Sequence, residues 1–232
     1  MKRTPLPLLA ITALVSSPAL LPATSLAAPP AAARAGDWIV RAGVTYVAPD
    51  DHTSSRNGQL GAALAGTDVA ASSEAQLGLT VAYLFTDRLA LELLAASPFE
   101  HDLSLAGGAL DGTPLGDIKH LPPTLSLQYR FATDSAFTPY VGLGLNYTVF
   151  FSEDVSSQAR ALGVTDLELD DSFGPAAQLG FDYAFGEHWL INADVRYLQI
   201  ETTAELRTAT GSTHLDVDID PWVYTLAAGY RF

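Results

Sequence analysis

The sequence predicts an all-β protein, an eight-stranded antiparallel up-and-down transmembrane β-barrel. Three observations lead to this fold. Segments in which apolar side chains alternate with small or polar ones follow one another along the chain, as in strands with lipid on one side and a polar lumen on the other. Short and long connections alternate strictly between these segments, as turns and loops do in such a barrel. Aromatic residues gather at both ends of the segments.

Seven segments with period-two alternation precede a final one at residues 222–232. They are 37–48, 75–85, 89–97, 118–131, 138–151, 172–185 and 189 to about 206. Their apolar faces, taken at every second residue, are Trp38 to Tyr46, Leu77 to Phe85, Leu89 to Ala95, Leu125 to Phe131, Val141 to Val149, Leu179 to Phe185 and Trp189 to Tyr197. The opposite faces carry Gly, Thr, Ser, Gln, Asn and a few charges. Together with the last segment they make the smallest common closed transmembrane barrel.

The connections fit this count. Residues 86–88, 132–137 and 186–188 are short links, whereas 49–74, 99–117, 152–171 and 208–214 are longer polar stretches. We therefore expect periplasmic turns and extracellular loops, respectively. Residues 156–162 predict a short helix in the third long loop.

Aromatic residues at the strand ends predict two membrane girdles. The periplasmic girdle would be Trp38, Phe85, Phe131, Phe137, Phe185, Trp189 and Phe232, and the outer one Tyr46, Phe151, Tyr197 and Trp222. The alternative is a soluble β-sandwich, whose interior gives no reason for Trp and Tyr at both strand ends. Tyr230 and the terminal Phe232 also resemble the C-terminal signal that the bacterial barrel-assembly machinery reads.

The N-terminus predicts export. Lys2 and Arg3 precede an apolar, proline-broken stretch, and Ser25-Leu26-Ala27 fits a small-x-small cleavage site, so residues 1–27 are predicted to be a signal peptide. The stretch is too short and too rich in proline to span a membrane as a helix. Residues 28–36 would be a flexible lead-in and 37–232 the barrel, placed in the bacterial outer membrane.

Composition excludes several function classes. The chain has 12 basic and 26 acidic residues, a net charge of -14, and no cysteine. Nucleic-acid binding is not expected of so acidic a chain, and neither disulfides nor thiolate metal sites can form. No cofactor motif is present, and the five histidines show no metal-binding spacing. His101 and Asp102 near Ser104 are weak grounds for catalysis, so we do not expect an enzyme.

Inward-facing charges of both signs predict an ion-pair plug in the periplasmic half of the lumen, because buried charges persist only when paired. The residues are Arg41, Glu92, Arg130, Asp182, Asp194, Arg196 and Arg231. The alternative is a polar conduit for ions. A plug would block the straight passage of an apolar molecule.

Prolines suggest another exit. Pro98 ends the third segment and Pro122-Pro123 begin the fourth, and proline has no N–H to continue the ladder. We hypothesise a lateral window there; alternatively, the prolines only end strands and shape the loop.

Apolar residues near the lumen mouth would line the entry to the channel. Leu94, Phe150 and Leu198 face inward by parity, and Phe173 would do so only if Gly174-Pro175 made a bulge. Leu60, Leu64 and Val69 of the first loop would supplement them. The alternative is ordinary packing of a narrow mouth.

Two rows of carboxylates lie at period two. They are Asp216, Asp218 and Asp220, and Asp166, Glu168 and Asp170. Such rows could hold divalent cations that bridge lipopolysaccharide phosphates, or they could simply form a solvated strand extension above the membrane.

Several motifs, in order, closely resemble the outer membrane protein W (OmpW) family. They are Gly78–Thr80 (GLT), Glu92–Phe99 (ELLAASPF), His120–Thr124 (HLPPT), Pro139–Gly142 (PYVG), Asn146–Phe151 (NYTVFF), Asp220–Val223 (DPWV) and Gly229–Phe232 (GYRF). The resemblance covers nearly the whole chain after the signal peptide and implies a small eight-stranded barrel. The chain departs from the family in its Ala- and Gly-rich residues 58–66 and in its acidic loops.

The resemblance also implies a function, passive uptake of small hydrophobic molecules; the family's AlkL branch helps alkanes to enter cells. The partners would then be small hydrophobic substrates, outer-membrane lipid and lipopolysaccharide, and the barrel-assembly machinery. Two alternatives stay open. One is a structural or surface-interaction barrel that binds lipopolysaccharide, cations or a receptor-binding protein, and the other is a narrow ion-conducting pore.

Overall fold

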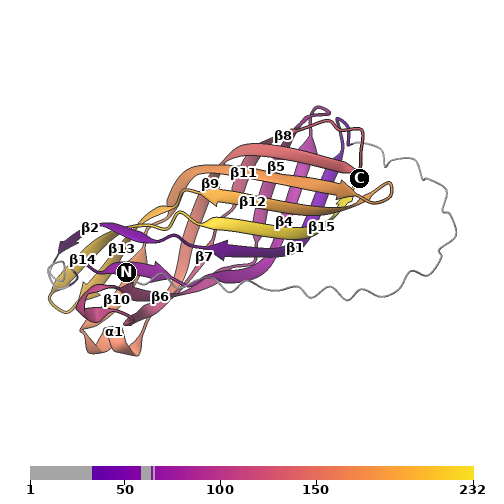
Figure 1. Ribbon diagram of the computed structural model, residues 1–232. Coiled ribbons are helices and arrows are strands. Elements are labelled where there is room, and N and C mark those ends of the chain that lie inside the picture. Colours follow the sequence, from indigo (N-terminus) through magenta and orange to yellow (C-terminus); the bar gives the residue numbers. More distant parts are fainter. Residues whose placement is uncertain (1–32, 59–63, 65) are drawn as a thin grey trace, which may run out of the picture.

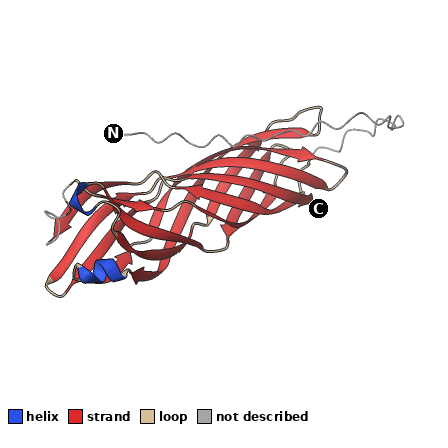
Figure 2. Ribbon diagram, turned by 60° about the horizontal axis from the view of Figure 1, so that its bottom comes forward, coloured by secondary structure: helices blue, strands red, loops and turns tan. Residues whose placement is uncertain are grey.

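The computed structural model describes residues 33–58, 64 and 66–232. The predicted signal peptide and most of the lead-in lie outside them. The described chain forms a closed β-barrel that continues at one end into a long β extension, with the chain's C-terminus at the other end of the barrel (Figure 1). Figure 2 shows that strands make up nearly all of both parts. No helix of the described part is long and apolar enough to cross a membrane.

Eight antiparallel strands close the barrel, which confirms the predicted fold. Each pairs with its neighbours in the chain order of the barrel strands, and β1 closes the ring by pairing with both β15 and β4. The barrel strands are β1 (Trp38–Ala48), β4 (Glu74–Leu84), β5 (Leu89–Ala96), β8 (Thr124–Arg130), β9 (Phe137–Val155), β11 (Ser172–Ala184), β12 (Trp189–Leu198) and β15 (Trp222–Arg231). The order is that of an up-and-down barrel, so each barrel strand has one face toward the lumen and one face toward the outside.

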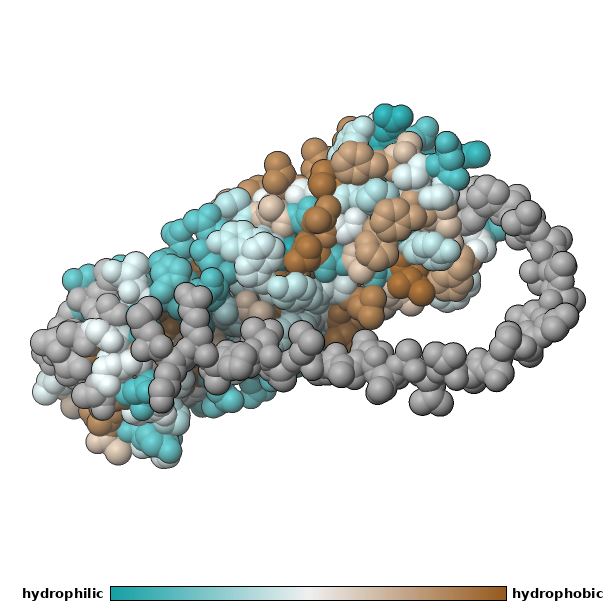
Figure 3. All heavy atoms as spheres, in the orientation of Figure 1, coloured by the Kyte–Doolittle hydropathy of each residue, from teal (hydrophilic) through white to brown (hydrophobic). Residues whose placement is uncertain are grey.

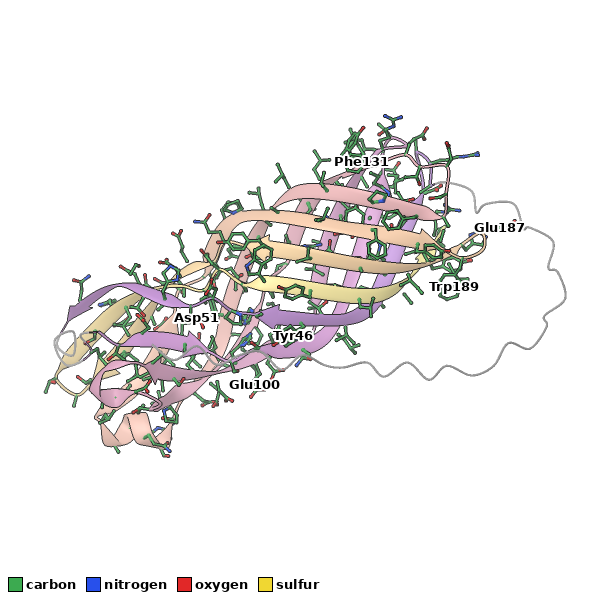
Figure 4. The ribbon with its side chains drawn as sticks, in the orientation of Figure 1. Tyr46, Asp51, Glu100, Phe131, Glu187 and Trp189 are labelled. Carbon is green, nitrogen blue, oxygen red and sulfur yellow. The ribbon has the colours of Figure 1, made fainter. Side chains whose placement is uncertain are left out.

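The outward face is apolar, as the alternation predicts. Leu77, Leu143 and Leu226 are 71%, 73% and 64% exposed, which suits contact with lipid and not with water. Hydrophobic side chains gather over the barrel, and hydrophilic ones cover its far end and much of the extension (Figure 3). Trp189 and Phe131 mark one end of this band and Tyr46 the other (Figure 4).

Short turns join the strands at the end away from the extension, which such a barrel directs to the periplasm. Phe85 N and Phe185 N donate to the carbonyls of Leu89 and Trp189 across two of these turns, at 3.1 and 2.9 Å. Gly186 has a φ of +87°, a conformation that favours glycine. The predicted periplasmic turns are therefore present.

The long connections differ from the prediction because they are not loops. They fold into strands that prolong the barrel beyond the membrane in two sheets. One has the order β10-β13-β14-β2, and the other, β3-β6-β7, pairs with the upper part of β9. The extension consists of β2 (His52–Gly58), β3 (Asp68–Ala71), β6 (Phe99–Ala106), β7 (Pro114–Leu121), β10 (Val164–Leu169), β13 (Glu201–Thr208) and β14 (Gly211–Asp218), with a 3-10 turn, η1 (Gly108–Leu110), and α1 (Ser157–Ala161).

Two predicted strands are each divided in two. The segment 118–131 is broken at Pro122-Pro123 into β7 and β8, and the segment 189–206 is broken after Leu198 into β12 and β13. β7 lies in the extension and β8 in the barrel wall, whereas β12 lies in the wall and β13 in the extension. The short helix is confirmed as α1, where the Ser156 side chain caps the Ala159 N–H at 3.0 Å.

The interior has three layers along the barrel axis. A large apolar core runs from the outer half of the lumen into the extension, and it includes Val47, Leu198, Leu215 and Val223. A small apolar cluster around Ile39 lies at the periplasmic end. Between the two lies a layer of buried charges.

Candidate functional site: the lumen and its wall

The charged layer is built around Arg41 of β1. Its guanidinium lies 2.7 Å from Glu92 Oε2 and forms a bidentate contact with Asp182, at 3.0 Å from Nε and 2.8 Å from Nη2. Arg130 Nη2 donates to the same Asp182 carboxylate at 2.6 Å. Each of these four residues is at most 3% exposed. Each is paired with an opposite charge at hydrogen-bond distance, which is the main condition for burying charge; Arg130 Nη1 is buried without a hydrogen bond within the described chain.

Arg196 extends the network to the next strand. Its Nη2 lies 2.8 Å from Glu92 Oε1 and 3.3 Å from Asp194 Oδ1. Three arginines thus face three carboxylates, and six of the seven predicted plug residues form one connected cluster across the lumen.

Arg231 is the exception, and its assignment to the plug is wrong. Its Nη2 donates to the Glu187 carbonyl at 2.5 Å, and its Nε is 3.8 Å from Asp37. Arg231 is the last residue of β15, so it reaches the rim of the barrel and not the charged layer. Glu187 lies at the periplasmic end in Figure 4.

Tyr140 is a member of the layer that the sequence reading missed. Its hydroxyl donates to Asp194 Oδ2 at 3.2 Å and accepts from Asn192 Nδ2 at 2.9 Å, and its ring lies 5.8 Å from the Arg41 guanidinium carbon. A Cβ on Gly180 would come within 2.5 Å of the hydroxyl, so glycine leaves room for the ring. The signal was available: Tyr140 lies at an inward position of β9, and the next two inward residues of that strand are Gly142 and Gly144.

Above the charges the lumen is closed by apolar packing. A cavity of about 10 Å³ remains, lined by Leu94, Val47, Leu198 and Val223 among others, and it has room for about one water molecule. Leu94, Leu198 and Phe150 are 4%, 1% and 7% exposed, so the predicted inward placement of these three is confirmed.

Phe173 does not line the lumen. It is 68% exposed, and β11 pairs with β9 in unbroken register from Ser172↔Thr148 onward. The bulge that would have turned it inward is absent from this pairing, and strict parity puts the ring outside. From the first connection, Leu64 and Val69 join the apolar core, whereas Leu60 lies outside the described residues.

The barrel wall is interrupted where the prolines predicted a window. The β5–β8 ladder ends at Leu94↔Thr124, and the β6–β7 ladder begins at Phe99↔His120. No ladder pair joins residues 95–98 to residues 121–123. The first segment contains Pro98, and the second contains Pro122 and Pro123. The predicted position of the break is therefore correct.

Polar side chains inside the lumen satisfy the carbonyls at the break. Thr124 Oγ1 donates to the Pro122 carbonyl at 3.1 Å, and Asn146 Nδ2 donates to the Pro123 carbonyl at 3.3 Å. Thr148 in turn donates to Asn146 Oδ1 at 2.7 Å. Thr124, Asn146 and Thr148 are fully buried. The break therefore costs less than an unsatisfied wall would in lipid.

Four aromatic rings cover the break on the extension side. His120 stacks on His101 at 4.9 Å and on Phe99 at 5.6 Å, and Phe150 lies 5.7 Å away. His101 also hydrogen-bonds the Ser72 carbonyl. Burial lowers the pKa of both histidines, that of His120 to about 3 with a contribution from neighbouring His101. Both rings are therefore neutral near pH 7.

The two acidic rows follow β10 and β14 in the extension, with Asp170 and Asp220 just beyond the strand ends, and neighbours engage them. Arg207 contacts Asp166 at 3.1 Å and Glu168 at 2.6 Å, and Asp220 accepts from Ile200 N and Tyr197 Oη. Within the described ranges no group of three or more His, Cys, Asp or Glu residues could hold a metal ion. The geometry is that of a hydrated strand extension.

Comparison with known proteins agrees with this architecture. The OmpW family model matches residues 34–232. Outer membrane protein W of Vibrio cholerae is 46% identical over 208 residues, which cover 88% of this chain and 93% of that protein. The crystal structure of OprG from Pseudomonas aeruginosa superposes with a TM-score of 0.78 at 46% identity, covering 86% of this chain and 97% of that one. The AlkL structure in lipid bilayers gives 0.66 at 25% identity, covering 93% and 97%.

Proposed function

The chain belongs to the OmpW family of outer-membrane barrels, and from that premise we propose that it admits small hydrophobic molecules passively and releases them sideways into the membrane. The observation that carries the proposal is the position of the wall break. It lies at the point where the apolar interior ends on the charged layer. Entry from the extension and exit at the break form one apolar route.

A straight route to the periplasm is unfavourable for an apolar cargo. The cargo would have to separate Arg41 from Asp182 and Arg196 from Glu92, all nearly inaccessible to water. Breaking such pairs leaves buried charges uncompensated, which is among the most costly changes in a protein interior. An apolar molecule offers them no replacement contact.

A lateral route needs smaller rearrangements. At the break no ladder hydrogen bonds have to be broken between residues 95–98 and 121–123. Leu94 and Ala96 line the lumen cavity there, and outward residues such as Leu77 and Leu125 are exposed on the lipid side. A cargo that moves outward therefore has apolar side chains on both sides of the wall. Only at the break itself does it pass Thr124 and Asn146, which hydrogen-bond the carbonyls of Pro122 and Pro123.

The names of two more distant relatives support a hydrophobic cargo. AlkL of Ectopseudomonas oleovorans is 25% identical over 201 residues, and that branch is the one whose resemblance implies alkane uptake. A second relative, 27% identical over 205 residues, is a dibenzothiophene metabolism operon protein of Pseudomonas aeruginosa. OmpW is a family of membrane barrels and not of enzymes, so the proposed role needs neither catalysis nor a cofactor.

The experiment is uptake of a labelled medium-chain alkane by cells with and without the protein. Pro122→Val with Pro123→Val restores two backbone donors at the break and should slow uptake; Leu94→Gln places a polar group in the passage and should do the same. Pro139→Val is the matched control, because Pro139 pairs with Phe181 away from the break. Assembly is checked by heat-modifiable gel mobility. Unchanged uptake in both well-assembled variants would contradict the proposal.

One observation favours a second candidate, a surface-interaction barrel. A hollow of about 650 Å³ between β9 and β10 is lined by five carboxylates, and these are Glu153, Asp166, Glu168, Asp170 and Asp171. A partner with a positively charged surface would fit this hollow. Retained binding of a polycationic probe such as polylysine after charge-neutral substitution of all five would exclude this candidate.

A further inference from the structure

His120 lies where the extension meets the lumen of the barrel. Its ring is 6% exposed, and it lines the same cavity as Leu94, Leu198 and Pro122. Its stack on Phe99 and its tilted contact with Phe150 hold the ring in place. A cargo on the proposed route passes beside this ring, because His120 and Pro122 line the same cavity.

One atom of this ring has no partner. His120 Nδ1 is buried and has no hydrogen bond within the described chain. A buried polar atom without a partner is destabilising, and native proteins have few of them. The ring is neutral near pH 7, with His101 as the titratable group that faces it. In a neutral imidazole Nδ1 is either a donor or an acceptor, and a hydroxyl group can pair with it in both cases.

The rest of the lining defines the class of ligand. Apart from His120, it is apolar except for Thr45, whose hydroxyl is 3.0 Å from that of Thr225. None of the described residues that line the cavity carries a formal charge at neutral pH. A carboxylate would therefore enter without a counter-charge, which is unfavourable. The cavity of about 10 Å³ has room for one small polar group before the apolar walls have to move.

We propose that His120 is a selectivity contact that favours neutral alcohols, a hydroxyl group on an apolar chain, over alkanes and carboxylates of the same length. The hydroxyl pairs with Nδ1, and the chain lies among Leu94, Leu198 and Val223. This rests on the proposed hydrophobic route and adds to it the polar group that the route recognises.

The direct test is the ¹⁵N spectrum of the histidine rings in the refolded full-length barrel, titrated with 1-octanol, octane or octanoate. We expect 1-octanol alone to shift the Nδ1 resonance of His120, which His120→Phe identifies. Equal shifts with octane, a larger shift with octanoate, or no shift with 1-octanol would overturn the proposal. This readout does not depend on transport.

Uptake by cells tests the role of His120 and the proposed function separately. His120→Phe keeps the stacked ring and removes the polar atom, and His214→Phe is the control because His214 is half-exposed on β14. In His120→Phe the ratio of 1-octanol to octane uptake should fall roughly fivefold, the factor that one hydrogen bond supplies. An unchanged ratio contradicts the role of His120 only. Wild-type cells that take up neither compound faster than cells without the protein contradict the proposed function itself.

Discussion

Arg41 and Asp182 face each other across the lumen from two strands that are not neighbours. Both carboxylate oxygens of Asp182 are engaged, at 3.0 Å from Arg41 Nε and 2.8 Å from Nη2. β12 and β15 separate their strands in the sheet. The contact therefore spans the lumen of the barrel, and in the proposed function it is the barrier to straight passage of an apolar cargo.

Asp182→Asn tests how much the assembled barrel depends on this contact. The substitution keeps the shape but leaves Arg41 and Arg130 without their shared carboxylate, so we expect a loss of about 3–5 kcal/mol in the free energy of unfolding. Denaturant titration in detergent micelles measures it. Glu100→Gln is the control, since its contact with Lys119 at 3.5 Å is exposed and should matter little. Equal effects of the two substitutions would contradict the role of the charged layer.

Thr124→Val tests the hydrogen bonds that hold the break together. It preserves side-chain volume but removes the donor to the Pro122 carbonyl, at an expected cost of about 1–3 kcal/mol. Because the lost bond is local, amide exchange should accelerate in the first residues of β8. Thr225→Val, which removes a contact with Thr45 on another part of the lumen wall, serves as the control. If exchange at β8 rises equally in both variants, the bond does not hold the break.

Gly43→Ala tests the close approach of β1 and β15. An added Cβ would lie 2.1 Å from the Leu226 carbonyl oxygen, and backbone cannot move aside as a side chain can. We expect a smaller fraction of heat-modifiable, folded barrel. Ala42→Val adds bulk at the neighbouring outward position, where β1 faces lipid, and should assemble normally. Normal assembly of Gly43→Ala would show that β1 and β15 can move apart enough to accept the added Cβ.

Acid should destabilise the protein through His120. Its pKa is about 3 in the folded state and 6.5 in the unfolded chain. Above pH 6.5 both states are neutral, and the group contributes no pH dependence. Below pH 6.5 the unfolded state binds a proton that the folded state does not accept until about pH 3, so stability falls across that window. At pH 5 the loss is about 2 kcal/mol.

The measurement is the free energy of unfolding at pH 7.5 and pH 5. His120→Phe should lose less stability between these two values than wild type does. It should keep part of the loss, because the pKa of His101 is lowered for the same reason. His214→Phe should behave as wild type. An identical loss in His120→Phe and wild type would mean that His120 is not buried in the neutral form.

The barrel was predictable because lipid on one side and a narrow lumen on the other impose period two on every strand. The same parity placed Leu94, Leu198 and the clustered charges inward. Parity gives the face of a residue but not its depth, and that is why Arg231 was assigned to the plug although it reaches the rim. For Phe173 the alternation alone predicts the outward face that the structure shows, and the bulge proposed to turn it inward was wrong.

The extension was predictable only in part: the acidic rows at period two indicated strands above the membrane, but not how those strands pair. Its strands face water on one side and a thin core on the other, so their alternation is short and mixed with charges, as in Asp166, Leu167, Glu168 and Leu169. The partner strands also lie far apart in sequence: Leu215 of β14 pairs with Arg56 of β2. Such pairings are set by the tertiary structure and leave little local signal.

The lateral exit is tested most directly by photolabelling. A medium-chain alkane that carries a diazirine would be added to cells, activated by light, and its adducts on the protein mapped by mass spectrometry. The account predicts adducts on Leu94, Phe99 and Leu198, which line the lumen cavity. It predicts none on Ile39, Leu84 and Leu190, the buried apolar cluster on the periplasmic side of the charged layer. Adducts on this second group would show that cargo passes straight through the charged layer, and would contradict lateral release.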